Sequence, residues 1–264
     1  MNNDLKNIQL VYEYVVRPSV LPENYYNSTL NQKFWTGSQF DSQIREKLLQ
    51  IAKEFYDSLK LTVPILDIQL TGSLANYNYT EYSDLDVHII IDFSKINEET
   101  DLVKKALDGM RFIWNLRHNI TIKGHDVEIY LQDINEQHTA SGLYSLLKGE
   151  WLREPSYNPP EVDEQDVELK YNHYVTEIEK IETRMKSDNL SDEDLQKVVN
   201  RANKLKQKAQ QDRKYCLQNH NEFCVENLVF KKLRNTGMIE KLINLGIEAY
   251  DRIYSEDELA TIKK

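Results

Sequence analysis

Apolar positions in the first half of the chain recur with two periods, and together they predict alternating helices and strands. Some stretches place apolar side chains three and four residues apart, as in an amphipathic helix. Others are short apolar runs, or alternate apolar and polar residues, as strands do. The stretches follow in the order helix 41–59, strand 65–70, strand 85–92, helix 98–117 and strand pair 119–132. This order predicts an α/β (α+β) fold, with a small mixed sheet flanked by helices.

The second half of the chain shows helical spacing only. Apolar residues recur at three- and four-residue intervals from residue 163 almost to the last residue. Ser191, followed three residues later by Asp194, is typical of a helix N-terminus. Helices are therefore expected at 163–187, 191–219, 222–235 and 237–254.

Turn-forming residues separate these two patterns. Gly149, Pro155 and the pair Pro159-Pro160 interrupt both periods. The first residues are rich in Tyr and Asn, and an apolar run at 8–16 there fits a strand. The predicted organisation is an unassigned N-terminal arm at 1–36, a core at 37–150, a linker at 151–162 and an all-helical domain at 163–264.

The charge of the chain limits its partners. A net charge of −10 argues against a protein whose whole surface binds nucleic acid. The charge is unevenly spread, because residues 161–196 carry a net −8 and residues 197–214 a net +6. A local basic helix of this kind can contact phosphate even in an acidic protein.

The sequence offers no sign of membrane insertion or secretion. It has no run of about 18 apolar residues, which a membrane-spanning helix needs. The residues after Met1 lack the basic and apolar regions of a secretory signal. Cys216 and Cys224 have no further Cys/His set beside them, so we expect no zinc site and two free thiols. These features predict a cytoplasmic protein without a membrane partner, in the host cytoplasm if its source is viral.

Two acidic residues open the second predicted strand. Asp84 and Asp86 are one residue apart, and strand alternation therefore places both carboxylates on one face. Gly72 and Ser73 end the preceding strand in a turn, where backbone can approach an anion closely. Oxygen ligands without a Cys/His set favour Mg²⁺ or Mn²⁺. The pattern predicts a divalent metal site beside a phosphate.

A third carboxylate is expected from the later strand. Asp126 and Glu128 share a face of the alternating segment after Gly124. Both remain open as the third ligand, and Glu128 is preferred because it lies deeper within the apolar alternation. Two metal ions held by three carboxylates could activate a nucleophile and neutralise a leaving pyrophosphate.

These residues carry a family resemblance. Gly72-Ser73 followed by Asp84-Leu85-Asp86-Val87 resembles the signature of the DNA polymerase β-like nucleotidyltransferase superfamily. The overall sequence, including the segments Glu128–Asp133 and Glu226–Lys231, is similar to nucleotidyltransferase-like proteins of large tailed phages. The resemblance spans about residues 40–135, and beyond it only the helical architecture is similar.

The resemblance implies a metal-dependent transfer of a nucleoside monophosphate from a nucleoside triphosphate. Gly72 and Ser73 would cradle the β- and γ-phosphates, while Asp84 and Asp86 would bind two Mg²⁺ or Mn²⁺ ions. The third acid maps to Glu128, where this sequence departs from the more usual aspartate. Because the helical domain of this superfamily often lends a lysine to the triphosphate, Lys204 and Lys208 are also candidates. Their alternative role is a solvated helix face that pairs with the acidic neighbouring helix.

Several interpretations of function stay open. The acceptor could be an RNA or tRNA 3′ end, a small molecule or a protein hydroxyl, and the +6 segment keeps a short single-stranded RNA end among these. The alternative class is a non-catalytic interaction protein that reuses the nucleotidyltransferase fold. A hydrolase with His88 or His125 as its base is disfavoured, because no Ser or Cys nucleophile stands in a recognisable arrangement with them.

Overall fold

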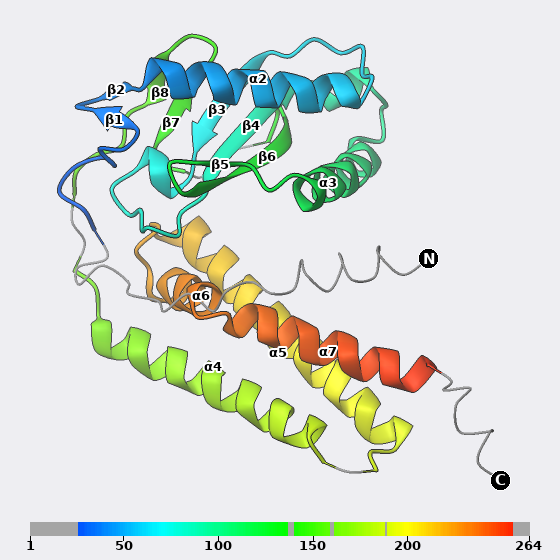
Figure 1. The fold of residues 1–264 in the computed structure, drawn as a ribbon. Helices are drawn as coiled ribbons and strands as arrows, with labels where there is room; N and C mark the ends of the chain where they lie inside the picture. The colour runs from blue at the N-terminus through cyan, green and yellow to red at the C-terminus, as the bar shows by residue number, and fades with distance from the viewer. Residues whose placement is uncertain (1–25, 137–139, 159–160, 188, 256–264) are drawn as a thin grey trace. The chain divides into compact units, whose positions relative to one another are not determined.

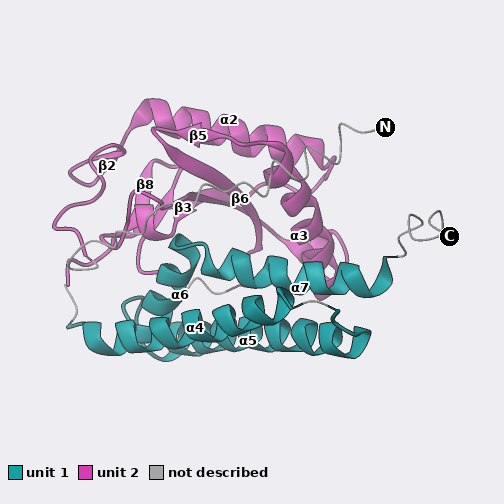
Figure 2. Cartoon of the chain, turned by 60° about the horizontal axis from the view of Figure 1, so that its bottom comes forward, with its two compact units in different colours: residues 1–20, 160–264 teal, residues 21–159 magenta. Residues whose placement is uncertain are grey.

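The computed structural model describes residues 26–136, 140–158, 161–187 and 189–255. These fall into two compact units, one within residues 21–159 and the other within residues 160–264, coloured separately in Figure 2. Each unit is described by itself. The strand predicted at 8–16 lies outside the described residues.

A six-stranded mixed sheet forms the centre of the first unit (Figure 1). Its strand order is β5-β6-β4-β3-β7-β8, and within this sheet only β4 and β6 are paired in parallel. The strands of the sheet are β3 Asp67–Thr71, β4 Leu85–Ile91, β5 Thr121–Ile122, β6 His125–Asp133, β7 Leu143–Ser145 and β8 Glu150–Arg153. A separate two-stranded ribbon pairs β1 Trp35–Thr36 with β2 Gln39–Phe40.

Helices accompany the sheet and make up the second unit. The first unit contains α2 Ser42–Ser58 and α3 Thr100–Arg117, and the second contains α4 Glu164–Met185, α5 Asp192–Asn219, α6 Val225–Asn235 and α7 Met238–Tyr254. The predicted fold class is thereby confirmed: a mixed sheet with helices, followed by a helical segment. The cap expected at Ser191 is present, because its side chain accepts from Asp194 N–H, and Asp41 caps α2 by accepting from Gln43 N–H.

The apolar face of the sheet supplies the core of the first unit. Strand alternation turns Leu70, Val87 and Ile129 to the same side, where all three are buried. Phe55 of α2 and Trp114 of α3 pack on this cluster, with their ring centroids 5.3 Å apart. Burial of each large apolar side chain contributes roughly 1.5–3 kcal/mol. The opposite face of β4 and β6 carries the polar residues Asp86, His88 and Glu128 and also the buried Ile90.

The edges of the first unit differ from the prediction. The arm expected at 1–36 contributes Phe34 and Trp35 to the core, where they are 1% and 3% exposed. Trp35 stacks on Trp151 of β8 with 4.5 Å between ring centroids. β7 and β8 were not predicted, and β8 occupies the first residues of the expected linker. Strands of three or four residues are too short to show a period, so their aromatic pairing was not visible in the sequence.

The second unit buries a separate apolar cluster between its helices. Ile178 of α4, Val198 of α5 and Leu242 of α7 belong to it. Ion pairs join the acidic and basic helices: Arg201 lies 2.6 Å from Glu177, and Arg184 lies 2.7 Å from Asp194. The pair of Arg201 and Glu177 therefore joins the basic segment to the acidic one, whereas Arg184 and Asp194 both belong to the acidic segment.

The cysteines overturn an expectation. Cys216 and Cys224 form a disulfide that links the last turn of α5 to the start of α6, rather than two free thiols. A separation of eight residues does not by itself show that a turn brings the two cysteines into contact. In the described part of the chain, the helices are all too short or too polar to cross a bilayer.

Candidate active site

Asp86 and Glu128 are partners across two parallel strands. The β4–β6 register pairs their Cα atoms directly, and partners in register present side chains on the same face. Neighbouring strands are about 4.8 Å apart, so the two carboxylates start from adjacent points on the sheet. Both side chains are half-buried, as are His88 and Tyr130 on the same face. Backbone pairing alone therefore brings together Asp86 and Glu128, two of the three predicted acids.

Gly72 lies directly against Asp86. A Cβ built on Gly72 would stand 1.9 Å from Oδ2 of Asp86 and 2.9 Å from its carboxyl carbon. The φ angle of Gly72 is +76°, a conformation that side-chain-bearing residues rarely adopt. Both features require glycine at this position, because the carboxylate of Asp86 occupies the place where a Cβ would lie.

The turn that follows Gly72 is fastened to the start of β4. Ser73 Oγ donates to Ser83 Oγ over 2.8 Å, which closes the ten-residue connector between the two parts of the motif. Ser83 Oγ also accepts from Thr80 N–H at 2.9 Å. His125 Nδ1 lies 2.7 Å from the Ser83 carbonyl, and the ring is 2% exposed. Because a carbonyl only accepts, Nδ1 carries the proton, and His125 holds the residue that precedes Asp84.

Tyr130 occupies the next position of the same face along β6. Its hydroxyl donates a hydrogen bond to Oε2 of Glu128. Burial raises the pKa of Tyr130, and the charges of Asp86 and Glu128 raise it further. The phenol therefore stays neutral and acts as a donor that orients Glu128.

Arg111 of α3 adds a positive charge at this face. Its guanidinium carbon lies 4.4 Å from the centroid of the Tyr130 ring, in a cation–π contact. Its Nε is 3.6 Å from Oδ1 of Asp108 but has no hydrogen-bond partner within the described residues. A buried N–H without an acceptor is costly, and it would favour a ligand oxygen nearby.

His88 lies one alternation further along β4, on the same face as Asp86. Its ring stacks on Tyr130 at 4.8 Å, and its Nδ1 is 2.7 Å from Oε1 of Gln132. His88 thus packs beside the acidic pair and uses Nδ1 to bind an amide.

The register distinguishes the two candidates for the third acid. Glu128 is level with Asp86, whereas Asp126 lies one alternation earlier, where its strand partner is Thr121 of β5. Asp84 directly precedes β4 and is half-buried. The arrangement favours Glu128 as the partner of Asp86, with Asp84 and Asp126 toward the same ends of the two strands.

The three predicted carboxylates share a face but do not converge on one point. Among the described residues, the one group of three Cys, His, Asp or Glu side chains that meets within 4.8 Å is Cys216, Cys224 and Glu226. Ionised carboxylates repel at short range, and rotation of the Asp86 and Glu128 side chains would bring their oxygens together around a cation. Hard oxygen donors, with the backbone of Gly72 in contact, suit Mg²⁺ or Mn²⁺ in chemistry.

Lys204 and Lys208 belong to the helical unit. Lys204 is exposed on α5, and Lys208 pairs with Asp212 of the same helix. Their expected approach to the phosphates at Gly72 and Ser73 stays a prediction, and the ion pair of Lys208 fits the solvated-face alternative.

Four residues of this site carried no clear signal in the sequence: Tyr130, Arg111, Ser83 and His125. The position of Tyr130 two residues after Glu128 was the one clue, because alternation places both on one face. Arg111 is remote in sequence and reaches the sheet only through the packing of α3.

No family model, curated protein or solved structure matches this chain.

Proposed function

We propose that this chain is a nucleotidyltransferase of the DNA polymerase β-like type that depends on Mg²⁺ or Mn²⁺. It would transfer a nucleoside monophosphate from a nucleoside triphosphate to a hydroxyl or phosphate acceptor. The observation that carries the proposal is the direct pairing of Asp86 with Glu128, with the backbone of Gly72 against Asp86. Acids aligned on one sheet face beside a glycine turn suit a phosphate–metal complex.

The roles of the residues follow from their positions. Asp84 and Asp86 would hold the metal ions, and Glu128 would hold an ion or take the proton of the acceptor hydroxyl. When bound, the ions neutralise charge on the triphosphate and lower the pKa of the attacking hydroxyl. The acceptor oxygen would form a bond to the α-phosphorus while the bond to pyrophosphate breaks. Positioning and charge neutralisation supply most of the rate enhancement in such reactions.

Neighbouring groups would support these roles. Gly72 allows the backbone of the turn to approach a phosphate, and the hydrogen bond from Ser73 to Ser83 fixes the turn against the start of β4. Tyr130 orients Glu128 through its hydroxyl. Arg111, whose Nε has no acceptor among the described residues, is placed to offset negative charge near the acids. The proposed location is the cytoplasm, where nucleoside triphosphates are present.

The test is transfer of label from each nucleoside triphosphate, with Mn²⁺ or Mg²⁺, without and with total RNA. We expect labelled product from at least one nucleotide, and the class of product identifies the acceptor: RNA, the protein itself or a small molecule. Asp86→Asn is expected to abolish transfer. The control Asp101→Asn, at an exposed position of α3, is expected to leave transfer unchanged. Transfer that persists in purified Asp86→Asn would contradict the assigned role of Asp86.

A chain that neither transfers label nor binds nucleotide with metal would support the other class, an interaction protein that reuses the fold. The contact between Gly72 and Asp86 favours the enzyme over this class, because a partner surface would not require it.

A further inference from the structure

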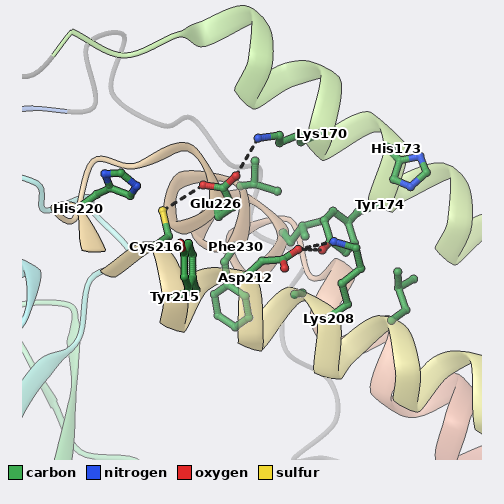
Figure 3. A pocket seen from close by; sticks show the side chains of 14 residues that line it. Lys170, His173, Tyr174, Lys208, Asp212, Tyr215, Cys216, His220, Glu226 and Phe230 are labelled. Atoms are coloured by element: carbon green, nitrogen blue, oxygen red, sulfur yellow. Dashed lines mark hydrogen bonds and ion pairs between the residues drawn. The ribbon is translucent and has the colours of Figure 1, made fainter. Parts of the chain in front are cut away.

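A second group of potential ligands lies in the helical unit, at the junction of α5 and α6. One side-chain atom each from Cys216, Cys224 and Glu226 lies within 4.8 Å of the others. Sγ of Cys216 is 3.1 Å from Oε2 of Glu226, the contact drawn as a dashed line in Figure 3. The three residues come from one helix–turn–helix segment, so local folding is enough to assemble the group.

The turn explains how the sequence brings these residues together. Cys216 lies in the last turn of α5, His220 follows that helix, and Cys224 is the residue that precedes α6. Asn221 Oδ1 accepts from Phe223 N–H at 2.9 Å and tightens the turn between them. Glu226 then falls in the first turn of α6, where a carboxylate is favoured by the helix dipole.

A lysine holds one oxygen of Glu226 and leaves the other toward the sulfur atoms. Lys170 of α4 donates to Oε1 of Glu226 at 2.8 Å, while Oε2 is the atom near Cys216. One oxygen of Glu226 is therefore held by Lys170, and the other lies beside the sulfur atom of Cys216.

The group is accessible from a cavity of about 430 Å³ between α4, α5 and α6. Cys216, His220 and Glu226 all line this cavity, as Figure 3 shows. Cys216 is 2% exposed and the side chain of Glu226 is 35% exposed, so one edge of the group is sheltered and the other is open. An entry path of this kind is required of a metal site in a folded protein.

We propose that reduction of the Cys216–Cys224 disulfide opens a site for Zn²⁺, held by the two thiolates and Glu226. A dithiol or phosphine reductant supplies two electrons, so that the S–S bond breaks and two thiols form while the reductant is oxidised. Binding of Zn²⁺ then releases the two thiol protons and forms two sulfur–metal bonds. The disulfide is the form without metal, and the fourth position of the ion is left to water or to His220.

The donor set selects this class of metal. Two thiolates with one carboxylate suit Zn²⁺, which prefers sulfur and nitrogen ligands in a tetrahedral arrangement, and they suit Mg²⁺ poorly. Lys170 donates a hydrogen bond to Glu226 and would orient this carboxylate as a metal ligand. No zinc site was expected from the sequence, because the two cysteines lack a further Cys/His set. In the proposed site Glu226 supplies the third ligand.

The test uses the untagged full-length chain, reduced with a phosphine, desalted under inert gas and titrated with Co²⁺. We expect one equivalent of Co²⁺ to bind with a thiolate-to-cobalt charge-transfer band, and stoichiometric Zn²⁺ to displace it. The oxidised chain is expected to show no such band. Co²⁺ bound at the oxygen ligands Asp84, Asp86 and Glu128 would not produce it either, so the two sites are distinguished.

Variants identify the ligands. Glu226→Gln keeps the size of the side chain and is expected to weaken Co²⁺ binding at least about 10-fold, as loss of a group that supports a metal does. Asp212→Asn, a carboxylate of the same cavity outside the group, should bind as the wild type does. Far-UV circular dichroism of each reduced, metal-free variant checks its fold. No charge-transfer band in the reduced wild type, or an unchanged affinity in Glu226→Gln, would overturn the proposal.

Discussion

Oδ2 of Asp86 lies 1.9 Å from the point that a Cβ would occupy on Gly72. The two residues belong to the separate halves of the motif, which are joined by a polar connector. Their contact means that any phosphate bound by the turn after Gly72 would lie near the carboxylate of Asp86. Gly72 and Asp86 are therefore neighbours in the folded chain as well as parts of one sequence motif.

Gly72→Ala tests this contact. The positive φ and the close approach of Asp86 both oppose a Cβ, so we expect a loss of roughly 1–3 kcal/mol in the free energy of unfolding. Gly124→Ala is the matched control, because Gly124 also has a positive φ, +86°, but nothing lies within 4 Å of its built Cβ. Urea denaturation of both variants gives the comparison. Equal losses at the two positions would show that Asp86 does not restrict Gly72.

The connector between the two halves of the motif offers a second test. Ser83 is 5% exposed, and its Oγ bonds both Ser73 Oγ and Thr80 N–H. Ser83→Ala should lower stability by about 1–2 kcal/mol, because the half-buried N–H of Thr80 loses its acceptor and Ser73 Oγ loses its partner. Ser73→Ala should cost less, since it leaves the bond to Thr80 intact. A double-mutant cycle of Ser73 and Ser83 measures their coupling, and a coupling of zero would contradict the hydrogen bond between them.

Tyr130→Phe isolates the donor to Glu128. Hydrogen bonds to charged groups contribute about 1.5–3 kcal/mol. The free energy of unfolding of Tyr130→Phe should therefore be about 1.5 kcal/mol lower than that of the wild type. Glu128→Gln is the reciprocal change: its amide oxygen still accepts from Tyr130, and loss of charge relieves repulsion with Asp86. Thermal unfolding without added metal should therefore rank Glu128→Gln above Tyr130→Phe. The reverse order would show that the hydroxyl of Tyr130 contributes little.

The helical unit has a pH-dependent ion pair. Hydrogen bonds from Lys180 and Arg201 lower the pKa of Glu177 to about 2, from an ordinary value of 4.5. A lowered pKa stabilises the folded chain above pH 4.5, and this contribution is lost as the pH falls toward 2. Glu177→Gln should therefore be slightly less stable at pH 7, by under about 1 kcal/mol because its partners Lys180 and Arg201 are largely exposed, and this difference should shrink as the pH falls through 2.

Thermal unfolding at both pH values measures this difference, with the exposed Glu179→Gln on the same helix as the control. A difference that persists unchanged at pH 2 would mean that the charge of Glu177 is not its source.

Local signals were enough to predict much of the fold. Asp41 and Ser191 begin α2 and α5 because their side chains accept from backbone N–H groups, which is a property of a few adjacent residues. The strand alternation around Asp86 and Glu128 likewise places both acids on a polar face. The in-register pairing of these residues could only be seen in the folded sheet, because sequence does not fix which strands become neighbours.

Features that depend on distant packing were not predictable. The apolar stripe expected on helix 98–117 includes Leu102, Val103, Leu107 and Ile113, yet of these only Val103 and Leu107 are buried, while Leu102 and Ile113 are 63% and 49% exposed. Arg111 reaches Tyr130 from that helix, and Trp35 reaches Trp151 across more than a hundred residues. Each contact depends on how one element packs on another, which the period of a single element does not contain.

The central claim is that Asp84, Asp86 and Glu128 bind divalent metal together with a nucleoside triphosphate. The most direct measurement is thermal unfolding with Mn²⁺ and ATP, supplied singly and together. At a ligand concentration 100-fold above Kd, binding to the folded chain adds about 2.7 kcal/mol of stability. We predict that the wild type is stabilised only when both are present, and that Asp86→Asn and Glu128→Gln are not. Equal stabilisation of all three proteins would contradict the account.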